Sequence, residues 1–385
     1  METFLNVENG PIWAAPMVRG SELAFRMYLR KYHFQICYTP MIKSELIVLG
    51  KNKMELKLLQ TCEGDTPLVA QLSGRDPETL YQAAKIVIAS FGDNLSAIDL
   101  NLGCPQECAK KGAYGAFLLD EPMQTFHCIQ ALCKASVENV NLNTNKKKVP
   151  IFCKIRIANT VEETLKYAKV IENAGAQLLA VHCRIRQSKH DGLPNYSYAK
   201  ALVNNLKIPI VVNGNVNDVK QAKQIIDAVG CLATMSATAI LRNPQLLHHN
   251  IDNTIGSIPL PSSLANEYIN FAIKYPPPDP LYIRKHFRWI FRNELEPKKP
   301  LITDEDWQNA INDVKNGWRV KLWTFLVRPY LKSLKQFRNV CKLYDVNSEG
   351  NLNRNIKYYV KFCDKNKVIE EEFIQPTFKS IRKGM

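Results

Sequence analysis

The chain has 385 residues, of which 46% are hydrophobic, and its formal net charge is +15 at pH 7. This length suits one large α/β domain with a smaller appendage, and the strong positive charge favours a polyanionic partner. No apolar run approaches the ~20 residues that a membrane-spanning helix needs, so we expect no membrane partner.

The first ten residues lack the basic-then-apolar pattern of a secretory signal. The cysteines number eleven, an odd count, and they show neither CxxC pairs nor zinc-like spacing. We therefore expect a reduced, metal-free protein of the cytoplasm, with the nucleus as an open alternative, acting as a monomer.

Eight short apolar runs, each ending in polar or turn-forming residues, are the main pattern of the first two thirds of the chain. Helical patterns follow seven of them, and this alternation predicts an α/β fold of the (β/α)8 (TIM) barrel type. Ser21, Thr160 and Asp218 stand where each could cap one of these helices. The eight runs are residues 12–15, 36–38, 68–70, 97–102, 151–153, 178–181, 208–212 and 232–235.

The fourth run breaks abruptly into Asn101-Leu102-Gly103-Cys104-Pro105. Gly103 permits a turn that a side chain would hinder, and Pro105 prevents a return to the strand. The thiol of Cys104 should therefore be presented at the end of a strand. A small buried filler is the ordinary role of a single cysteine, but polar residues at other strand ends favour a site.

Catalytic residues of such barrels lie on the face formed by the carboxyl ends of the strands. Each polar residue there has an ordinary structural explanation when taken alone, but their shared placement predicts one common site. They are Gln71, Asn101, Cys104, Lys154, Arg156, His182, Arg184 and Asn213.

This set contains no metal-ligand cluster and no pair of carboxylates. An amide, a cation and the loop Asn213-Gly214-Asn215 suit a planar, electron-rich ring with a phosphate tail, such as a flavin. A neutral thiol, with an ordinary pKa of roughly 8.5, is a credible proton donor to a carbon that has just accepted hydride.

A proline-rich linker near residues 255–261 ends the strand pattern. We expect a barrel domain over residues 1–255, a smaller basic helical domain over 262–345, and a polar tail over 346–385, partly disordered. An apolar stripe at 283, 287, 290 and 291 adjoins Arg284, Arg288 and Arg292, and a second basic helix is expected near Pro329. These basic faces favour RNA contact over an ordinary solvated surface.

Seven motifs between residues 11 and 250 resemble those of the tRNA-dihydrouridine synthase family, most closely the eukaryotic branch acting on D-loop uridines 20a and 20b. The motifs are Pro16-Met17-Val18 with Phe25-Arg26, Tyr38-Thr39-Pro40-Met41-Ile42, Asn101 to Pro105, Gly112 to Gly115, Lys154-Ile155-Arg156, Val181-His182-Cys183-Arg184 and Asn213-Gly214-Asn215.

The resemblance implies FMN as cofactor, NADPH as reductant and tRNA as substrate. Cys104 would protonate C5 of uracil while the reduced flavin delivers hydride to C6. Asn101 and Arg184 would lie near the base or the flavin edge. On the charge pattern described above, Arg284, Arg288 and Arg292 would contact the tRNA. The residues implied to hold FMN are Pro16, Met17, Val18, Gln71, Lys154, His182, Asn213, Gly214, Asn215, Ala237 and Thr238.

The chain departs from the family pattern at three places. Cys183 stands where the family usually has glycine, Asn215 where it often has aspartate, and Ala237-Thr238-Ala239 where an arginine is expected. Phosphate binding would then depend on backbone N–H groups, with Arg242 as a further candidate. Two alternatives stay open: a small-molecule flavin oxidoreductase on the same barrel, and a tRNA-binding protein that has lost its flavin.

Overall fold

The computed structural model describes residues 1, 4, 11–141, 148–188, 191–247 and 259–292. Eight parallel strands form a closed barrel in the order β2-β1-β9-β8-β7-β6-β5-β4, because β2 also pairs with β4. The short β3 extends the β2 side and pairs only with β4 among the described strands. The strands are β1 Ile12–Ala14, β2 Cys37–Tyr38, β3 Ile42–Lys43, β4 Leu68–Ser73, β5 Leu95–Leu102, β6 Ile151–Ile157, β7 Leu178–Ile185, β8 Ile210–Asn213 and β9 Ala233–Ser236.

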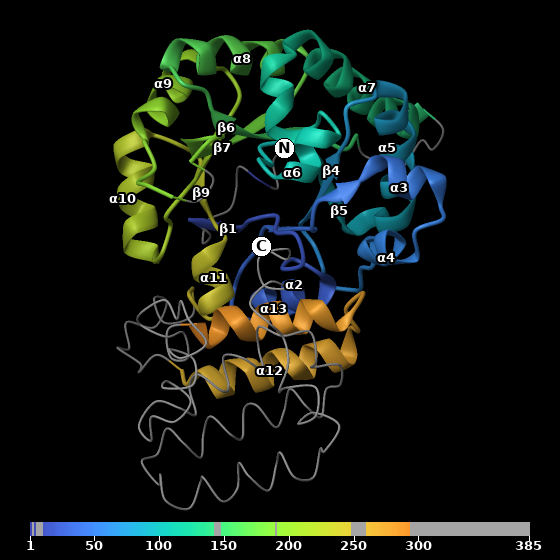
Figure 1. The fold of residues 1–385 in the computed structure, drawn as a ribbon, viewed down its shortest axis with the longest axis vertical. Coiled ribbons are helices and arrows are strands. Elements are labelled where there is room, and N and C mark those ends of the chain that lie inside the picture. Colours follow the sequence, from blue (N-terminus) through green and yellow to red (C-terminus); the bar gives the residue numbers. More distant parts are fainter. Residues whose placement is uncertain (2–3, 5–10, 142–147, 189–190, 248–258, 293–385) are drawn as a thin grey trace, which may run out of the picture. The chain divides into compact units, whose positions relative to one another are not determined.

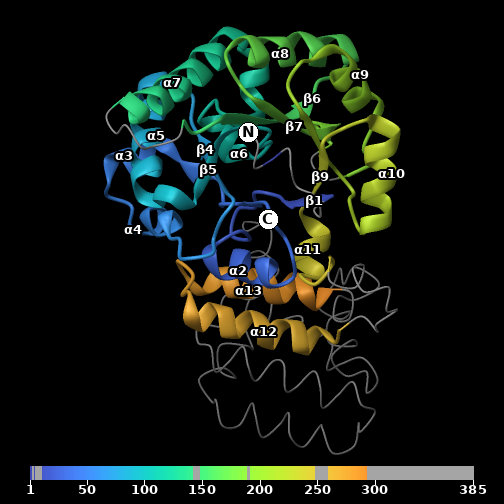
Figure 2. The same ribbon diagram turned by 180° about the vertical axis from the view of Figure 1, so that it is seen from behind.

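Helices alternate with these strands, and α5, α7, α8, α9 and α10 lie around the outside of the strands (Figures 1 and 2). This confirms the predicted barrel. The helices of the barrel are α2 Leu23–Lys31, α3 Ser44–Leu49, α4 Lys53–Leu56, α5 Pro77–Phe91, α6 Glu107–Lys111, α7 Pro122–Asn141, α8 Val161–Asn173, α9 Ser197–Asn205, α10 Val219–Val229 and α11 Thr238–Arg242, with a 3-10 helix η3 over Gly115–Asp120.

Local sequence signals explain where several helices begin. The Thr160 side chain accepts the backbone N–H of Glu163, whose carboxylate accepts that of Thr160, so α8 begins with a capping box. Asp218 accepts the backbone N–H of Gln221 (2.7 Å) at the start of α10. The cap expected from Ser21 is wrong, since its hydroxyl instead accepts the N–H of Met17 (2.8 Å) and closes the turn after β1.

The barrel interior changes from apolar to polar along each strand. Alternate residues of a strand point to the same side, so one strand contributes side chains to both the apolar layer and the polar layer of the interior. On β6, Phe152 belongs to the buried apolar cluster in the barrel. Lys154 and Arg156 are later alternate residues of the same strand and therefore point to the same side as Phe152. On β5, Ala97 is followed in the same way by Asp99 and Asn101. The apolar layer therefore supports a polar face at the carboxyl ends of the strands.

The chain divides into two compact units, residues 1–257 with 271–282, and residues 258–270 with 283–385. Within the described part, the second unit contains most of α12 (Pro261–Lys274) and α13 (Pro280–Ile290). The expected apolar stripe of Ile283, Phe287, Ile290 and Phe291 is buried. The basic helix expected near Pro329 and the tail over 346–385 lie outside the described residues. No helix in the described ranges is both long and apolar enough to cross a membrane.

Candidate active site

The thiol of Cys104 lies in the loop between β5 and α6 and is half-buried. The side chain of Asn101 accepts the N–H groups of Gly103 (3.2 Å) and Cys104 (3.0 Å), and the N–H of Ala116 donates to the Cys104 carbonyl (3.0 Å). Gly115 has φ +65°, and a Cβ there would lie 2.8 Å from the Cys104 oxygen. The loop is thus fixed from both sides.

Burial raises the pKa of the Cys104 thiol, and the nearby Cys108 raises it further, against the lowering effect of Arg156 and Lys43. Arg156 also donates from Nε to the Gly103 carbonyl (2.9 Å). At neutral pH the thiol is therefore protonated. It is suited to donate a proton and poorly suited to act as a nucleophile.

A chain of side-chain hydrogen bonds runs from the barrel interior to this loop. The fully buried Asp99 accepts from Nε2 of Gln71 (2.8 Å), so the Gln71 carbonyl oxygen faces Asn101 and accepts from its Nδ2 (2.8 Å). That bond turns the Asn101 oxygen towards the thiol loop. The carboxylate of Asp99 thus sets the amide orientation of two predicted site residues.

Lys154 on β6 donates to Oδ1 of Asn213 on β8 (3.0 Å), and Asn213 donates to the carbonyl of Met235 (2.8 Å). Burial, together with the positive charge of Arg156, lowers the pKa of Lys154 to about 8, although the carboxylate of Asp99 opposes this shift. Burial also raises the pKa of Asp99 to about 7. A cation and a carboxyl group with shifted pKa values in one polar layer are typical of a functional site.

His182 and Arg184 end β7 and join the loops beside it. Nη1 of Arg184 lies 3.2 Å from Nε2 of His182, and Nη2 reaches Oδ1 of Asn215 (3.3 Å). Gly214 has φ +131°, and a Cβ there would lie 3.3 Å from the His182 ring. The positive φ favours glycine here, and the His182 ring and Pro194 pack directly against the Gly214 backbone.

The remaining residues assigned to the cofactor lie at the ends of β1 and β9, which are neighbours in the barrel. Met17 is buried after β1, Pro16 is half-buried and Val18 is 48% exposed. Ala237 and Thr238 follow β9, with Arg242 as the last residue of the short α11. The structure thus places the predicted barrel residues in the carboxyl-terminal halves of their strands or directly after them, with Gln71, Lys154 and His182 two or three residues before the strand ends.

These residues suit a planar ring with a phosphate tail. The amide of Gln71 and the cation of Lys154 offer hydrogen bonds to ring heteroatoms. Asp99 Oδ1 and the Tyr38 hydroxyl are also buried without a hydrogen-bond partner in the part of the chain that the structure describes. Unpaired buried polar atoms of this kind are expected where a bound group completes the site.

The three arginines of the second unit differ from a uniform basic face. Arg288 is exposed, whereas Arg284 and Arg292 are half-buried, and the Arg292 guanidinium lies 4.8 Å from the centre of the Trp289 ring. Among the described residues there is no group of three His, Cys, Asp or Glu side chains placed to hold a metal ion.

Asp99 is the site residue that sequence reasoning missed. It lies two positions before Asn101 on the same strand and therefore faces the same interior. A carboxylate at an inward position of an otherwise apolar strand was a signal that could have identified it. Burying a charge is costly unless it is paired, so such a residue usually has a specific role.

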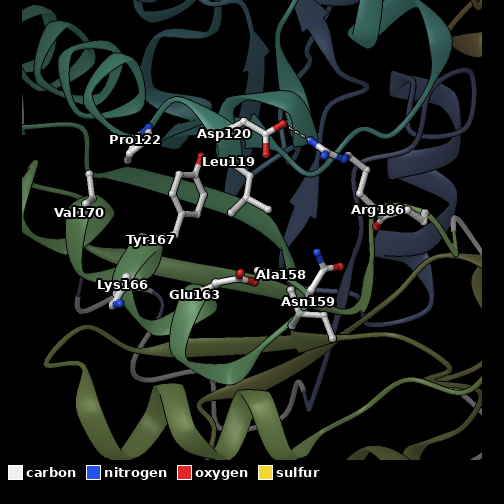
Figure 3. Close-up of a pocket in the computed structure, with 12 residues that line it drawn as sticks. Leu119, Asp120, Pro122, Ala158, Asn159, Glu163, Lys166, Tyr167, Val170 and Arg186 are labelled. Atoms are coloured by element: carbon white, nitrogen blue, oxygen red, sulfur yellow. Dashed lines mark hydrogen bonds and ion pairs between the residues drawn. The ribbon is translucent and has the colours of Figure 1, made fainter.

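A cavity of about 370 Å³ is bounded by η3, the end of β6, α8 and the residues after β7 (Figure 3). The predicted site residues do not line it, so sequence reasoning gave no indication of it.

A family model described as dihydrouridine synthase matches residues 13–316. A tRNA-dihydrouridine(16/17) synthase-like protein of Rattus norvegicus is 35% identical, and the matched region covers 74% of this chain and 61% of the rat protein. The tRNA-dihydrouridine(16/17) synthase of Saccharomyces cerevisiae is 41% identical, with 60% and 52% covered. A tRNA-dihydrouridine(20a/20b) synthase-like protein of Homo sapiens is 32% identical, with 60% and 69% covered.

A solved 2-naphthoyl-CoA reductase has the same barrel fold, with a TM-score of 0.51 and 11% identity over 82% of this chain and 63% of its own. This chain spans about half to two thirds of the length of the 16/17 relatives quoted above.

Proposed function

Since the chain belongs to the dihydrouridine synthase family, we propose that it reduces uridine in tRNA to dihydrouridine, using bound FMN and NADPH. In this reaction the C5–C6 double bond of uracil becomes a single bond. C6 gains a hydride, C5 gains a proton, and NADPH is oxidised to NADP⁺. The names of the relatives, which include tRNA and NAD(P), support the substrate and the reductant class.

The observation that carries the proposal is the protonated thiol of Cys104, fixed beside the polar layer that holds Lys154 and Gln71. FMN bound there would supply the two-electron chemistry. Cys104 then donates its proton to C5, and Asn101, next to it, orients the base. Lys154 places a positive charge against the electron-rich ring, and Gln71 hydrogen-bonds the ring edge.

The phosphate of FMN would lie at the ends of β8 and β9, near Gly214, Asn215, Ala237 and Thr238. The arginine expected after β9 is absent from the sequence there, and Arg184 already reaches Asn215. Backbone N–H groups are adequate phosphate ligands, with Arg242 one turn away. We therefore expect FMN to bind, with an affinity that depends more on the loop backbone than on a cation.

The test uses the purified protein, NADPH, and tRNA isolated from cells that lack it. The expected result is flavin absorbance in the protein and new dihydrouridine in the tRNA. A protein that carries flavin and oxidises NADPH but leaves tRNA unchanged, while reducing free pyrimidines, would be a small-molecule oxidoreductase. A protein that binds tRNA and takes up no flavin would be a binding protein.

The uridine position needs its own test. The motifs of the sequence predict positions 20a and 20b. The two relatives with 16/17 in their names are, however, 35% and 41% identical to this chain, whereas the human 20a/20b relative is 32% identical. Transcripts that each retain uridine at only one of positions 16, 17, 20a and 20b would show which position is reduced. Reduction confined to 20a or 20b agrees with the expectation, and reduction at 16 or 17 overturns it.

A further inference from the structure

The segment η3 (Gly115–Asp120) lies directly against the loop that carries Cys104. The N–H of Ala116 donates to the Cys104 carbonyl (3.0 Å), and the backbone at Gly115 leaves no room for a Cβ beside the same oxygen. Phe117 and the Cys104 side chain pack against one small apolar cluster. That cluster consists of Met41, Ala109 and Tyr114. The position of η3 therefore determines where the thiol lies.

Arg186, the residue that directly follows β7, contacts η3 at three places. Its Nη1 donates to the carbonyl of Ala116 (3.1 Å) and to Oδ2 of Asp120 (2.7 Å), and Figure 3 shows the ion pair with Asp120. Its guanidinium carbon lies 4.9 Å from the centre of the Phe117 ring. One side chain at the end of β7 thus holds the segment that borders the thiol loop.

The three contacts differ in what they contribute. The ion pair lies at the surface, where the Asp120 side chain is 61% exposed, so it stabilises little by itself. Ala116, in contrast, is buried, and its carbonyl accepts a hydrogen bond from a charged donor. The same planar group lies over the Phe117 ring, a contact that arginine makes better than lysine. Together the last two contacts can hold η3 in one position.

The thiol must lie within hydrogen-bond reach of C5, because its S–H bond breaks as the C5–H bond forms. Resting on the proposed function, we propose that Arg186 is a positioning residue for Cys104. It holds η3 through the Ala116 carbonyl and the Phe117 ring, and η3 in turn keeps the thiol loop in the geometry for proton transfer. Arg186 takes no part in the proton transfer itself.

The test replaces Arg186 by glutamine in the full chain. Arg75→Gln is the matched control, because Arg75 forms a surface ion pair (2.6 Å) with Glu121, the residue directly after η3. Each protein is reduced with NADPH and mixed with saturating tRNA under anaerobic conditions, and the reoxidation of its flavin is followed in a single turnover. A misplacement of about 1 Å can slow a step ~10²-fold, so we expect this rate to fall about 10- to 100-fold in Arg186→Gln. In Arg75→Gln it should stay within about twofold of the wild type.

Three further measurements separate positioning from binding. Flavin content, flavin reduction by NADPH and the Kd for tRNA should be unchanged in Arg186→Gln, because these steps do not use the thiol. Alkylation of Cys104 by iodoacetamide, followed by mass spectrometry of its peptide, should become faster because a loosened loop exposes the thiol. Arg186→Lys keeps the charge but lacks the planar group, so it should recover only part of the turnover rate.

An unchanged turnover rate in Arg186→Gln would overturn the proposal, and so would an equal fall in Arg75→Gln. A weaker tRNA affinity that Arg186→Lys fully restores would make Arg186 an RNA contact and also overturn it. If Arg186→Gln does not fold, wild-type turnover and alkylation rates in Arg186→Lys would overturn it instead. A wild type that forms no dihydrouridine refutes the proposed function, and the alkylation rates then decide whether Arg186 holds the thiol loop.

Discussion

At the scale of single residues, the protonation of Cys104 decides its role. Because burial keeps the thiol neutral, Cys104→Ala removes a proton donor and no charge. We expect dihydrouridine formation to fall by roughly 10²–10⁴-fold, the usual contribution of a general acid, with flavin content and NADPH oxidation retained. Mass spectrometry of tRNA nucleosides measures the product.

The matched control is Cys108→Ala, which removes an exposed thiol four residues away. It should leave product formation within about twofold, because it removes the hydrogen bond from the Tyr114 hydroxyl (3.6 Å) and the effect of Cys108 on the Cys104 pKa but leaves the proton donor in place. Equal losses in both variants would contradict the assignment of Cys104.

Lys154 gives the site a pH dependence. Its pKa of about 8 means that the ammonium is charged at pH 7 and largely neutral at pH 9.5. If this charge holds the flavin ring, the FMN affinity of the apoprotein should be steady near pH 7.5 and weaken as the pH rises through 8. Fluorescence titration of FMN between pH 7.5 and 9.5 measures it.

Lys154→Arg is the comparison, because a guanidinium stays charged throughout this range. Its FMN affinity should be lower overall but flat across the same pH window. A wild-type Kd that does not change between pH 7.5 and 9.5 would show that the lysine charge does not contribute to binding.

At the scale of elements, the turn into η3 controls the thiol loop. Gly115→Ala puts a Cβ 2.8 Å from the Cys104 carbonyl oxygen, so the loop must move. Gly50→Ala is matched in backbone conformation, with φ +65° at both positions, but nothing lies within 4 Å of its Cβ. Both variants should lose the stability that a positive φ costs alanine, and Gly115→Ala should lose more because of the clash, whereas only Gly115→Ala should lose dihydrouridine formation. Thermal melting and the tRNA assay separate the two effects.

The strand and helix pattern was largely predictable because periodicity and capping are local. Thr160 and Asp218 cap the helices expected of them. Ser21 was wrongly assigned because the turn after β1 offers its hydroxyl a nearer donor, the Met17 N–H. The role of Asp99 depends on a partner 28 positions earlier on another strand, and the cavity of about 370 Å³ is lined by separate segments at η3, α8 and the residues after β7. Such long-range proximity is set by barrel closure and leaves no local pattern.

At the scale of the whole molecule, the positive charge suits the proposed large anionic substrate. The net charge of +15 favours counterion release on RNA binding, so affinity for tRNA should fall steeply with salt. In the second unit Arg288 is the exposed arginine of the three assigned to tRNA, while Arg284 and Arg292 are half-buried. If all three arginines were replaced together, a loss of RNA contacts could not be distinguished from a disturbance of α13.

Arg288→Gln is therefore the sharper test of the basic face. If Arg288 neutralises one phosphate, the slope of log K against log salt should become shallower by about 1, and the KM for tRNA should rise. Lys223→Gln, an exposed charge of α10, is the control and should leave the slope unchanged. Flavin content and NADPH oxidation without RNA should not change in either variant. Equal slopes for Arg288→Gln and the wild type would assign this arginine to an ordinary solvated surface, and the RNA contacts would then have to be sought among the basic residues of the barrel face.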